Sequence, residues 1–458
     1  MADTLNPSLR RAVRYGWFPL IALAATTALE TGERQSLSQA VDGIQHQFHV
    51  SDAAVGWLPF AMAIVAIPGS IPIGILTDRV RRTWLLAAAI ALWTVCMGLN
   101  AIATSYALLF VFRMGVGAVE ANGPATVSLI SDYYPAKDRA RYMGLYQSGA
   151  LVGALIGLIG GGVAVAHGGW RWAFLMWMPI GLVVTLLMAR QPEPRRGDQD
   201  ADFHDDLAAT VAMPGGGDLV EQLSGMAALL PEPERVGTLD YASATPREVG
   251  RELLRIRSMW FGVLALTISQ MLLNGLAFWG VPYFKRVHHL GAAKAGAVTG
   301  LLGLGSVFGI LGGGYLADRY LARGIVCARV YVVAIGSILA TVVLMPAFAS
   351  TNLAVTAPLL FVGGAFLTLP VAPAEALVSD VVVAELRGRA ATVRSIVRTL
   401  SYVGAPVIGL LADAIGLRLA LVAMTPIYAV GGVVMLGAVR SYPRDVAFVV
   451  AESRRRRE

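Results

Sequence analysis

The chain has 458 residues and a formal net charge of +7; 56% of its residues are hydrophobic and only 15% are charged. Soluble domains carry about a quarter charged residues, so this composition excludes an ordinary soluble enzyme or nucleic-acid-binding domain. The mean hydropathy of +0.62 indicates a chain that crosses a membrane several times. The two cysteines, Cys96 and Cys327, lie in separate apolar segments, which argues against a disulfide framework or a metal cluster.

The N-terminal stretch MADTLNPSLRRAVRYGW is polar and basic, and no A-x-A-like cleavage site follows it. We therefore expect the first apolar segment, 15–40, to remain as a membrane span. This segment is unusual because Glu30, Glu33 and Arg34 lie inside it. One charged side chain at the centre of a membrane helix costs about 2.5–3.5 kcal/mol. Such groups face the bundle interior, pair with each other or line water, so these three are candidate functional residues.

Eleven further apolar segments predict an all-α membrane protein with twelve spans. Lys and Arg concentrate in alternate loops, so the positive-inside rule places both termini in the cytoplasm. Arginine strongly outnumbers lysine and the chain is rich in Ala, Gly and Val, which suggests a multi-pass protein of a bacterial inner membrane. The later expected spans are 53–76, 84–103, 106–131, 142–166, 172–190, 259–283, 292–316, 326–348, 354–379, 392–412 and 417–439.

The segment 191–257 separates the sixth and seventh spans and holds thirteen of the 30 acidic residues. It opens QPEPRRGDQDADFHDD and contains PGGG and PEPER, a composition typical of a tether rather than a packed domain. Its last residues, REVGRELLRIRS, predict a cytoplasmic helix that leads into the seventh span. The expected organisation is a bundle over 1–190, a cytoplasmic linker over 191–257 and a bundle over 258–458. A regulatory linker is the alternative to a tether.

The sequence repeats itself across this linker. GILTDR at 74–79 returns as GYLADR at 314–319, and LISD at 129–132 returns as LVSD at 377–380. The two halves are therefore expected to be parallel copies of one six-helix unit. Parallel repeats of this kind place a binding site between the halves near the bilayer midplane, with access alternating by rocking.

The run Gly74-x-Leu76-x-Asp78-Arg79-x-x-Arg82 resembles the loop signature of the major facilitator superfamily. Three other stretches are similar to its spinster family: Glu33-Arg34, RMGVGAVEANGP at 113–124, and SLISDYYPAKDRARYMGLYQSGALVG at 128–153 followed by GGWRWAF. The resemblance implies a secondary transporter for an amphipathic lipid such as a lysophospholipid, proton-coupled in some members. Anion:cation symporters of the superfamily share a similar fourth-helix pattern.

In the superfamily's arrangement the first and fourth helices both line the central cavity. The resemblance therefore implies that Glu33, Arg34, Arg113 and Glu120 form one buried charge network. If Glu33, or as second choice Glu120, takes up a proton, a freed arginine can bind an anionic headgroup bidentately. Glu30 lies four residues before Arg34 and can pair with it. The alternative is a set of ion pairs that only orients the helices.

In the second half, Gln270 and Asn274 share a face of the seventh span and would bond either a polar headgroup or a neighbouring helix. Glu375 follows Pro370 and Pro373 in the tenth span, and proline frees backbone carbonyls at places that often move or bind. Glu375 is therefore either functional or solvated at the cytoplasmic end.

The repeated loop predicts a conformational latch, because the superfamily uses it to hold the cytoplasmic side closed. The alternative is a set of solvated charges that fixes topology. The expected members are Gly74, Asp78, Arg79 and Arg82 with Asp132 and Asp413 as partners, and Asp318 and Arg319 with Asp380 in the second copy.

Three further sequence patterns predict details of local structure. Gly149, Gly153 and Gly157 recur every fourth residue and predict close packing of the fifth helix on the eighth. His46-x-x-His49 is expected just outside the first helix without a metal, since no further ligand cluster joins it. Arg394 and Arg398 enter the eleventh span on one face, and their side chains are expected to snorkel to the cytoplasmic interface.

We therefore expect a non-enzymatic secondary transporter that works by alternating access, needs no cofactor and uses the proton as coupling ion. No phosphate-binding loop indicates ATP-driven transport or catalysis. Its partners would be membrane lipids and a lysolipid or other amphipathic anion, without nucleic acid, and the protein would be a monomer. The alternatives are a transporter of small organic anions, a drug efflux antiporter and a non-transporting membrane sensor.

Overall fold

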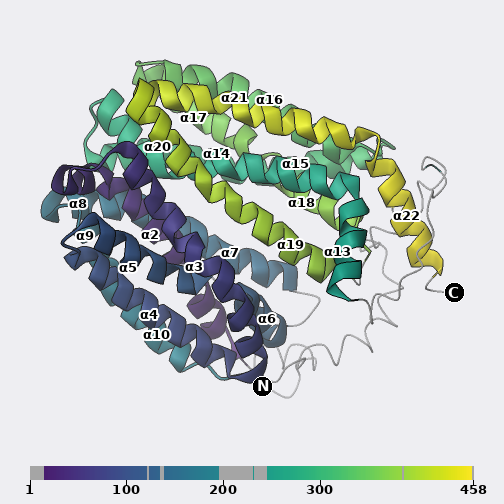
Figure 1. The fold of residues 1–458 in the computed structure, drawn as a ribbon, viewed down its shortest axis with the longest axis horizontal. Helices are drawn as coiled ribbons and strands as arrows, with labels where there is room; N and C mark the ends of the chain where they lie inside the picture. Colours follow the sequence, from purple (N-terminus) through teal and green to yellow (C-terminus); the bar gives the residue numbers. More distant parts are fainter. Residues whose placement is uncertain are drawn as a thin grey trace, which may run out of the picture. The chain divides into compact units, whose positions relative to one another are not determined.

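The structure is a computed structural model that describes residues 15–120, 123–134, 139–194, 231, 245–383 and 386–455, with the side chains of some helical residues excepted. These residues form helices and connecting turns, without a strand among them (Figure 1). The chain divides into two compact units. Unit 1 comprises Met1–Met213 and Ala277–Ala297, and unit 2 comprises Pro214–Leu276 and Val298–Glu458.

The first half of the chain contributes the elements α2 Phe18–Phe48, α3 Asp52–Arg79, α4 Arg82–Ile102, α5 Tyr106–Glu120, α6 Gly123–Tyr133, α7 Arg139–Leu155, η2 Ile156–Gly160, α8 Gly161–Gly168, α9 Trp172–Leu175 and α10 Trp177–Ala189. After the linker come α13 Pro246–Arg255, α14 Arg257–Val287, α15 Ala292–Ala322, α16 Ala328–Ala349, α17 Leu353–Thr368, α18 Val371–Asp380, α19 Arg387–Thr399, η5 Leu400–Val403, α20 Gly404–Ile415, α21 Leu417–Leu436, η6 Gly437–Val439 and α22 Tyr442–Arg455.

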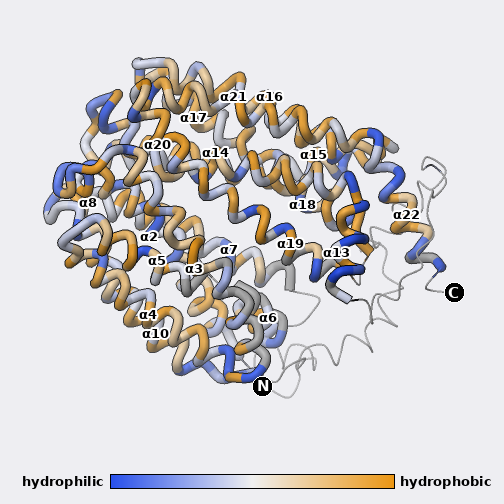
Figure 2. The backbone as a smooth tube through the Cα atoms, in the orientation of Figure 1, coloured by the Kyte–Doolittle hydropathy of each residue, from blue (hydrophilic) through white to orange (hydrophobic). Residues whose placement is uncertain are grey.

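Hydropathy agrees with this architecture. Within the described ranges, nine helices are long and apolar enough to cross a membrane, and two shorter apolar helices cover Asp52–Ala66 and Tyr106–Gly117. The charged first helix α2 does not meet that criterion, although it occupies the first predicted span. Figure 2 shows the predominantly hydrophobic character of α16 and α21, which pack together in unit 2. The all-α membrane fold is confirmed, and the helices are consistent with twelve spans.

Helix α2 is longer than the predicted span 15–40 and runs to Phe48. It continues because its polar side chains, including those of Asp42 and Gln45 beyond residue 40, find partners inside the unit. Ser38 Oγ donates to the carbonyl of Phe278 at 2.5 Å, and Gln39 Nε2 donates to the carbonyl of Leu158 at 2.8 Å. His46 consequently lies inside the helix instead of beyond it, and His49 ends it in the left-handed region with φ 52°.

The glycines that recur every fourth residue in the fifth span pack on α2. A Cβ added at Gly153 would overlap the backbone oxygen of Ala28, and Gly149 and Gly157 meet α2 in the same way. The prediction that these three pack on the eighth helix is therefore wrong. Further along the same span, Gly162 does contact the start of α15. Backbone contact this close is possible only where both surfaces lack bulky side chains.

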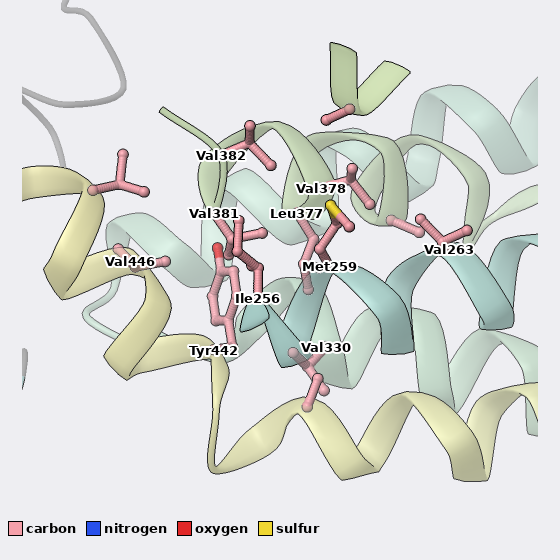
Figure 3. Packing of buried hydrophobic residues seen from close by; sticks show 14 of the residues in the cluster. Ile256, Met259, Val263, Val330, Leu377, Val378, Val381, Val382, Tyr442 and Val446 are labelled. Carbon is pink, nitrogen blue, oxygen red and sulfur yellow. The ribbon is translucent and has the colours of Figure 1, made fainter. Parts of the chain in front are cut away.

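Two helices at the ends of the second half form a layer on unit 2. A capping box begins α13, in which Thr245 and Glu248 satisfy each other's backbone groups. The apolar side chains of α13 and α22 join one buried cluster with α14 and α18, and Figure 3 shows Tyr442 and Val446 among its members. The side chain of Asp445 accepts hydrogen bonds from the backbone N–H (3.1 Å) and hydroxyl (2.6 Å) of Ser258 near the start of α14.

The boundary between the units differs from the predicted division at residue 258. The later part of α14 and the start of α15, Ala277–Ala297, belong to unit 1. Polar contacts explain this grouping, because Arg286 forms ion pairs with Asp42 and Asp52 at 3.0 and 2.8 Å. The Lys285 ammonium also lies 2.5 Å from the Asp42 carboxylate.

Candidate functional site

The most deeply buried charges among the described side chains of unit 1 come from two different spans. Arg113 of α5 donates through Nη1 to Oε1 of Glu33 on α2, and the two side chains are 0% and 1% exposed. The second terminal nitrogen of Arg113 lies 3.1 Å from the sulfur of Met62 on α3. Three helices therefore enclose one ion pair that has no access to solvent in this conformation.

This pair is costly to build and more costly to break. Moving two charges out of water carries a large desolvation penalty, which their mutual attraction offsets only in good geometry. Removing one partner from a buried pair typically costs about 3–5 kcal/mol, because the other charge is left uncompensated. Arg113 Nε has no hydrogen-bond partner among the described residues. The guanidinium thus retains a donor for a further acceptor.

The structure places the other predicted network members differently. Glu30 and Arg34 are half-buried on α2. Arg34 lies about 100° around the helix from Glu33, and Glu30 lies about one turn before it and about 60° around the helix. The side chains of Glu120 and Asp78 and the surroundings of Gly74 lie outside the described residues. The contacts of the described side chains thus join Glu33 and Arg113, two of the four residues predicted to form one network.

A second ion cluster in unit 1 centres on Arg82 at the start of α4, and we call it the Arg82 cluster. Arg82 pairs with Asp132 on α6 and donates to Ser128 at 2.7 Å. Its Nε also lies 2.8 Å from Glu193, and Nη2 donates to the carbonyl of Pro194 at 3.2 Å. The cluster therefore ties the first residues after α10 to the beginning of α4 and the end of α6.

Glu193 was not identified from the sequence, because it lies in the acidic linker. Burial alone would raise the pKa of this carboxyl group. Hydrogen bonds from the backbone and hydroxyl of Thr83, both 3.0 Å, and from Arg82 outweigh burial, so the pKa lies below its usual value. Glu193 is therefore held as a carboxylate by three donors.

Unit 2 contains a corresponding cluster around Arg329, at the start of α16, and we call it the Arg329 cluster. Arg329 pairs with the buried Asp380 at the end of α18 and lies 3.6 Å from Asp318 on α15. Asp318 is 71% exposed, so the Asp380 pair is the buried part of the cluster. Arg329 occupies the place that Arg82 has in unit 1, as the cation at the start of the third helix of its repeat.

The predicted latch members Arg319, Asp413 and Arg79 are not among the residues that define the Arg82 cluster and the Arg329 cluster. Arg319 donates to Tyr315 of its own helix at 2.9 Å instead of joining Asp380. Asp413 is exposed near the end of α20. Its assignment to the latch stays a prediction. Arg79 ends α3 and is exposed.

The second half carries one further charge cluster inside the spans. Glu375 on α18 pairs with Arg394 on α19, and Arg398 lies one turn further at 3.9 Å. The expectation that both arginines snorkel is therefore wrong for Arg394, which has a protein partner. Asn274 donates to Ser401 on η5 at 3.0 Å, so of its two predicted roles the helix–helix bond is present. Gln270 is half-buried on the same helix.

No group of three or more metal-ligating side chains occurs in the described part of the chain. The arrangement instead consists of repeated ion clusters and buried charges within apolar helices. Together with the two helical units, these features define a multi-pass α-helical membrane protein of the secondary-transporter class.

Residues 23–403 match the Major Facilitator Superfamily, and the chain belongs to that family. Its relatives include the protein spinster of Drosophila melanogaster, 22% identical over 330 residues that cover 69% of this chain and 49% of that protein. Protein spinster homolog 1 of Xenopus tropicalis is 25% identical over 421 residues, covering 86% and 73%. The chain thus spans about half the length of the Drosophila relative. The predicted resemblance to spinster proteins is confirmed.

Solved structures share the fold. A bacterial homolog to the human lysosomal transporter Spinster, in an inward-facing and unoccupied conformation, matches with a TM-score of 0.75 at 20% identity, covering 94% of this chain and 98% of that one. A D-xylose-proton symporter matches with a TM-score of 0.66 at 15% identity, covering 93% and 97%. At these identities the likeness establishes the fold.

Proposed function

We propose that the protein is a proton-coupled transporter of an anionic amphiphile such as a lysophospholipid. It would work by alternating access in a bacterial inner membrane, with both termini in the cytoplasm. The observation that carries the proposal is the fully buried ion pair between Glu33 and Arg113, formed by two different spans. The lipid substrate is supported by the spinster-like stretches of the sequence and by the spinster relatives.

The pair suggests how proton and substrate are coupled. While Glu33 is ionised, it occupies Arg113 and no anion can reach that guanidinium. A proton on Glu33 cancels its charge, and Arg113 then presents parallel N–H groups that suit a phosphate or carboxylate. The anion and the ionised Glu33 compete for one cation, so substrate binding favours the protonated state. Net transport then follows the proton gradient.

The Arg82 and Arg329 clusters would serve as the latches of this cycle. Each joins the start of the third helix of its repeat to the end of the fourth. In the proposed topology both lie at the cytoplasmic side, where a transporter must close when it opens outward. Stable pairs at these positions would keep the helix ends of each half together as the halves rock.

The test is uptake of labelled lysophosphatidic acid and lysophosphatidylcholine into proteoliposomes, with and without a pH gradient. The expected result is flux of at least one lysolipid that accelerates when a gradient is imposed. Flux that ignores the gradient would remove the proton from the proposal. Uptake of a small organic anion such as a sugar acid, without flux of any lysolipid, would replace the lipid substrate. The absence of flux for every compound would leave a membrane sensor.

A further inference from the structure

The cluster of Glu375, Arg394 and Arg398 in unit 2 has no part in the mechanism described above. Arg394 and Arg398 are one turn apart on α19, on the same face of the helix. Arg398 also lies near the start of the candidate span Ile396–Ile415. A guanidinium there can reach the headgroup region, where the phosphates of lipids lie.

The charges of this cluster do not balance. One carboxylate, Glu375, pairs with Arg394 and lies 3.9 Å from Arg398, a distance too long for a hydrogen bond. Arg394 also has a buried Nε without a hydrogen-bond partner in the described ranges. The side chain of Arg398 is 49% exposed, and no hydrogen bond joins it to the residues described. Two guanidiniums therefore share one acid and keep several donors for another anion.

The surroundings of the cluster are amphipathic. One turn beyond Arg398 the polar face continues with Ser401, which is bonded to Asn274. The alkyl side chains of Ile396 and Leu400 are exposed beside this face. Figure 2 shows hydrophilic residues interrupting the hydrophobic ones along α19. The regular helix also gives way to the 3-10 segment η5 directly after this cluster.

We propose that Arg394 and Arg398 form a phosphate-binding subsite on unit 2 that takes the headgroup of an anionic lysolipid. Two guanidiniums one turn apart offer the fork-shaped donors that match phosphate oxygens. Glu375 acts as the resident counter-ion that occupies Arg394 when the subsite is empty. The exposed side chains of Ile396 on α19 and Leu400 on η5 contact the adjoining part of the lipid. This subsite rests on the proposed function, since it specifies the substrate as a lysolipid with a net negative headgroup.

The test measures equilibrium binding of labelled lysophosphatidic acid to the purified full-length protein, with the phosphate-free monoacylglycerol of the same chain length as a second probe. Arg398→Gln should weaken binding of lysophosphatidic acid about tenfold or more, the loss of a charged hydrogen bond, and leave monoacylglycerol binding unchanged. Arg398→Lys should restore part of the affinity, because it keeps the charge without the fork. Glu375→Gln should strengthen binding, since it removes the competing carboxylate.

Arg418→Gln, an exposed arginine at the start of α21, is the matched control and should bind as wild type. Wild-type binding and flux of lysophosphatidic acid combined with an unchanged Arg398→Gln variant would overturn the subsite and leave the proposed function standing. Equal weakening of both probes by Arg398→Gln would also overturn it, because the arginine would then act on the fold. If wild type neither binds nor transports any lysolipid, the proposed function fails first and the subsite fails with it.

Discussion

The hydroxyl group of Tyr442 donates a 2.7 Å hydrogen bond to Oδ2 of Asp380, the same carboxylate oxygen that pairs with Arg329. Tyr442 begins α22, so the last helix of the chain is attached to the Arg329 cluster. Burial is the main cause that raises the pKa of Tyr442 to about 12. The hydroxyl therefore stays protonated and remains a donor throughout the physiological range.

Replacing Tyr442 by Phe should lower the free energy of unfolding by about 1.5–3 kcal/mol, the usual net worth of a hydrogen bond to a charged group. The melting temperature should fall by about 2–4 °C for each kcal/mol in a unit of this size. Thermal unfolding in detergent, followed by tryptophan fluorescence, measures the change. Tyr331→Phe on α16, which alters an exposed ring, is the control and should change little. Equal melting temperatures for both variants would show that the Tyr442 hydroxyl contributes nothing.

The pair of Glu33 and Arg113 predicts a contrast between single and double variants. Arg113→Gln leaves a buried carboxylate without a cation and should destabilise the protein by about 3–5 kcal/mol. Glu33→Gln in the same chain should recover most of that loss, since no charge then remains. Thermal unfolding compares the four proteins, and purely additive effects would contradict direct coupling.

Glu33→Gln alone also tests the coupling step. It imitates a permanently protonated acid, so lysolipid exchange should persist while uptake loses its response to a pH gradient. Glu30→Gln on the same helix is the comparison and should keep the gradient response. A gradient response that survives in Glu33→Gln would remove this residue as proton carrier.

The close approach of α7 to α2 predicts opposite effects for two glycines on one helix. Gly153→Ala adds a Cβ that overlaps the backbone oxygen of Ala28, so the helices must separate and stability should fall. Gly144→Ala meets no atom within 4 Å and should stabilise α7 by up to about 1 kcal/mol through helix propensity. The two melting temperatures should therefore move in opposite directions, and a shift of the same sign in both would refute the packing argument.

Glu193 predicts a specific dependence of stability on pH. Its pKa is lower in the folded protein than the ordinary value of 4.5, so its contacts contribute fully above that value. The contribution is lost as the pH falls through the lowered folded value. Between pH 7 and pH 3 the melting temperature of wild type should therefore fall more steeply than that of Glu193→Gln. Parallel curves for the two proteins would show that this carboxylate is not held by Arg82 and Thr83.

The sequence allowed most of the fold to be predicted, because hydropathy locates spans without knowledge of their neighbours. It failed where a contact decides the outcome. Helix α2 continues past residue 40 since Asp42 and Gln45 find a cationic partner in Arg286 on α14. A stripe of small residues predicts close packing but does not identify the partner, so Gly153 was assigned to the wrong helix.

The site was predicted less completely, for a related reason. Glu33 and Arg113 could be proposed as neighbours because charges inside spans face the bundle interior, and because the superfamily resemblance implied that the first and fourth helices line one cavity. Arg329 was missed because the second copy has a longer turn before its third helix, which displaces the cation from the spacing of Arg82. Aligning the repeats helix by helix, with the cation at the start of the third helix as the reference point, would have found it. Glu193 gave no comparable signal among its acidic neighbours.

The hydrogen bonds from Ser258 to Asp445 have a consequence for biosynthesis. The amide near the start of the seventh span receives its acceptor from a residue that is translated 187 positions later. During synthesis that end of the helix must remain hydrated or unfinished until Asp445 has left the ribosome. The assembly of the second unit therefore waits for α22, and a chain that stops before this helix would lack the acceptor for Ser258.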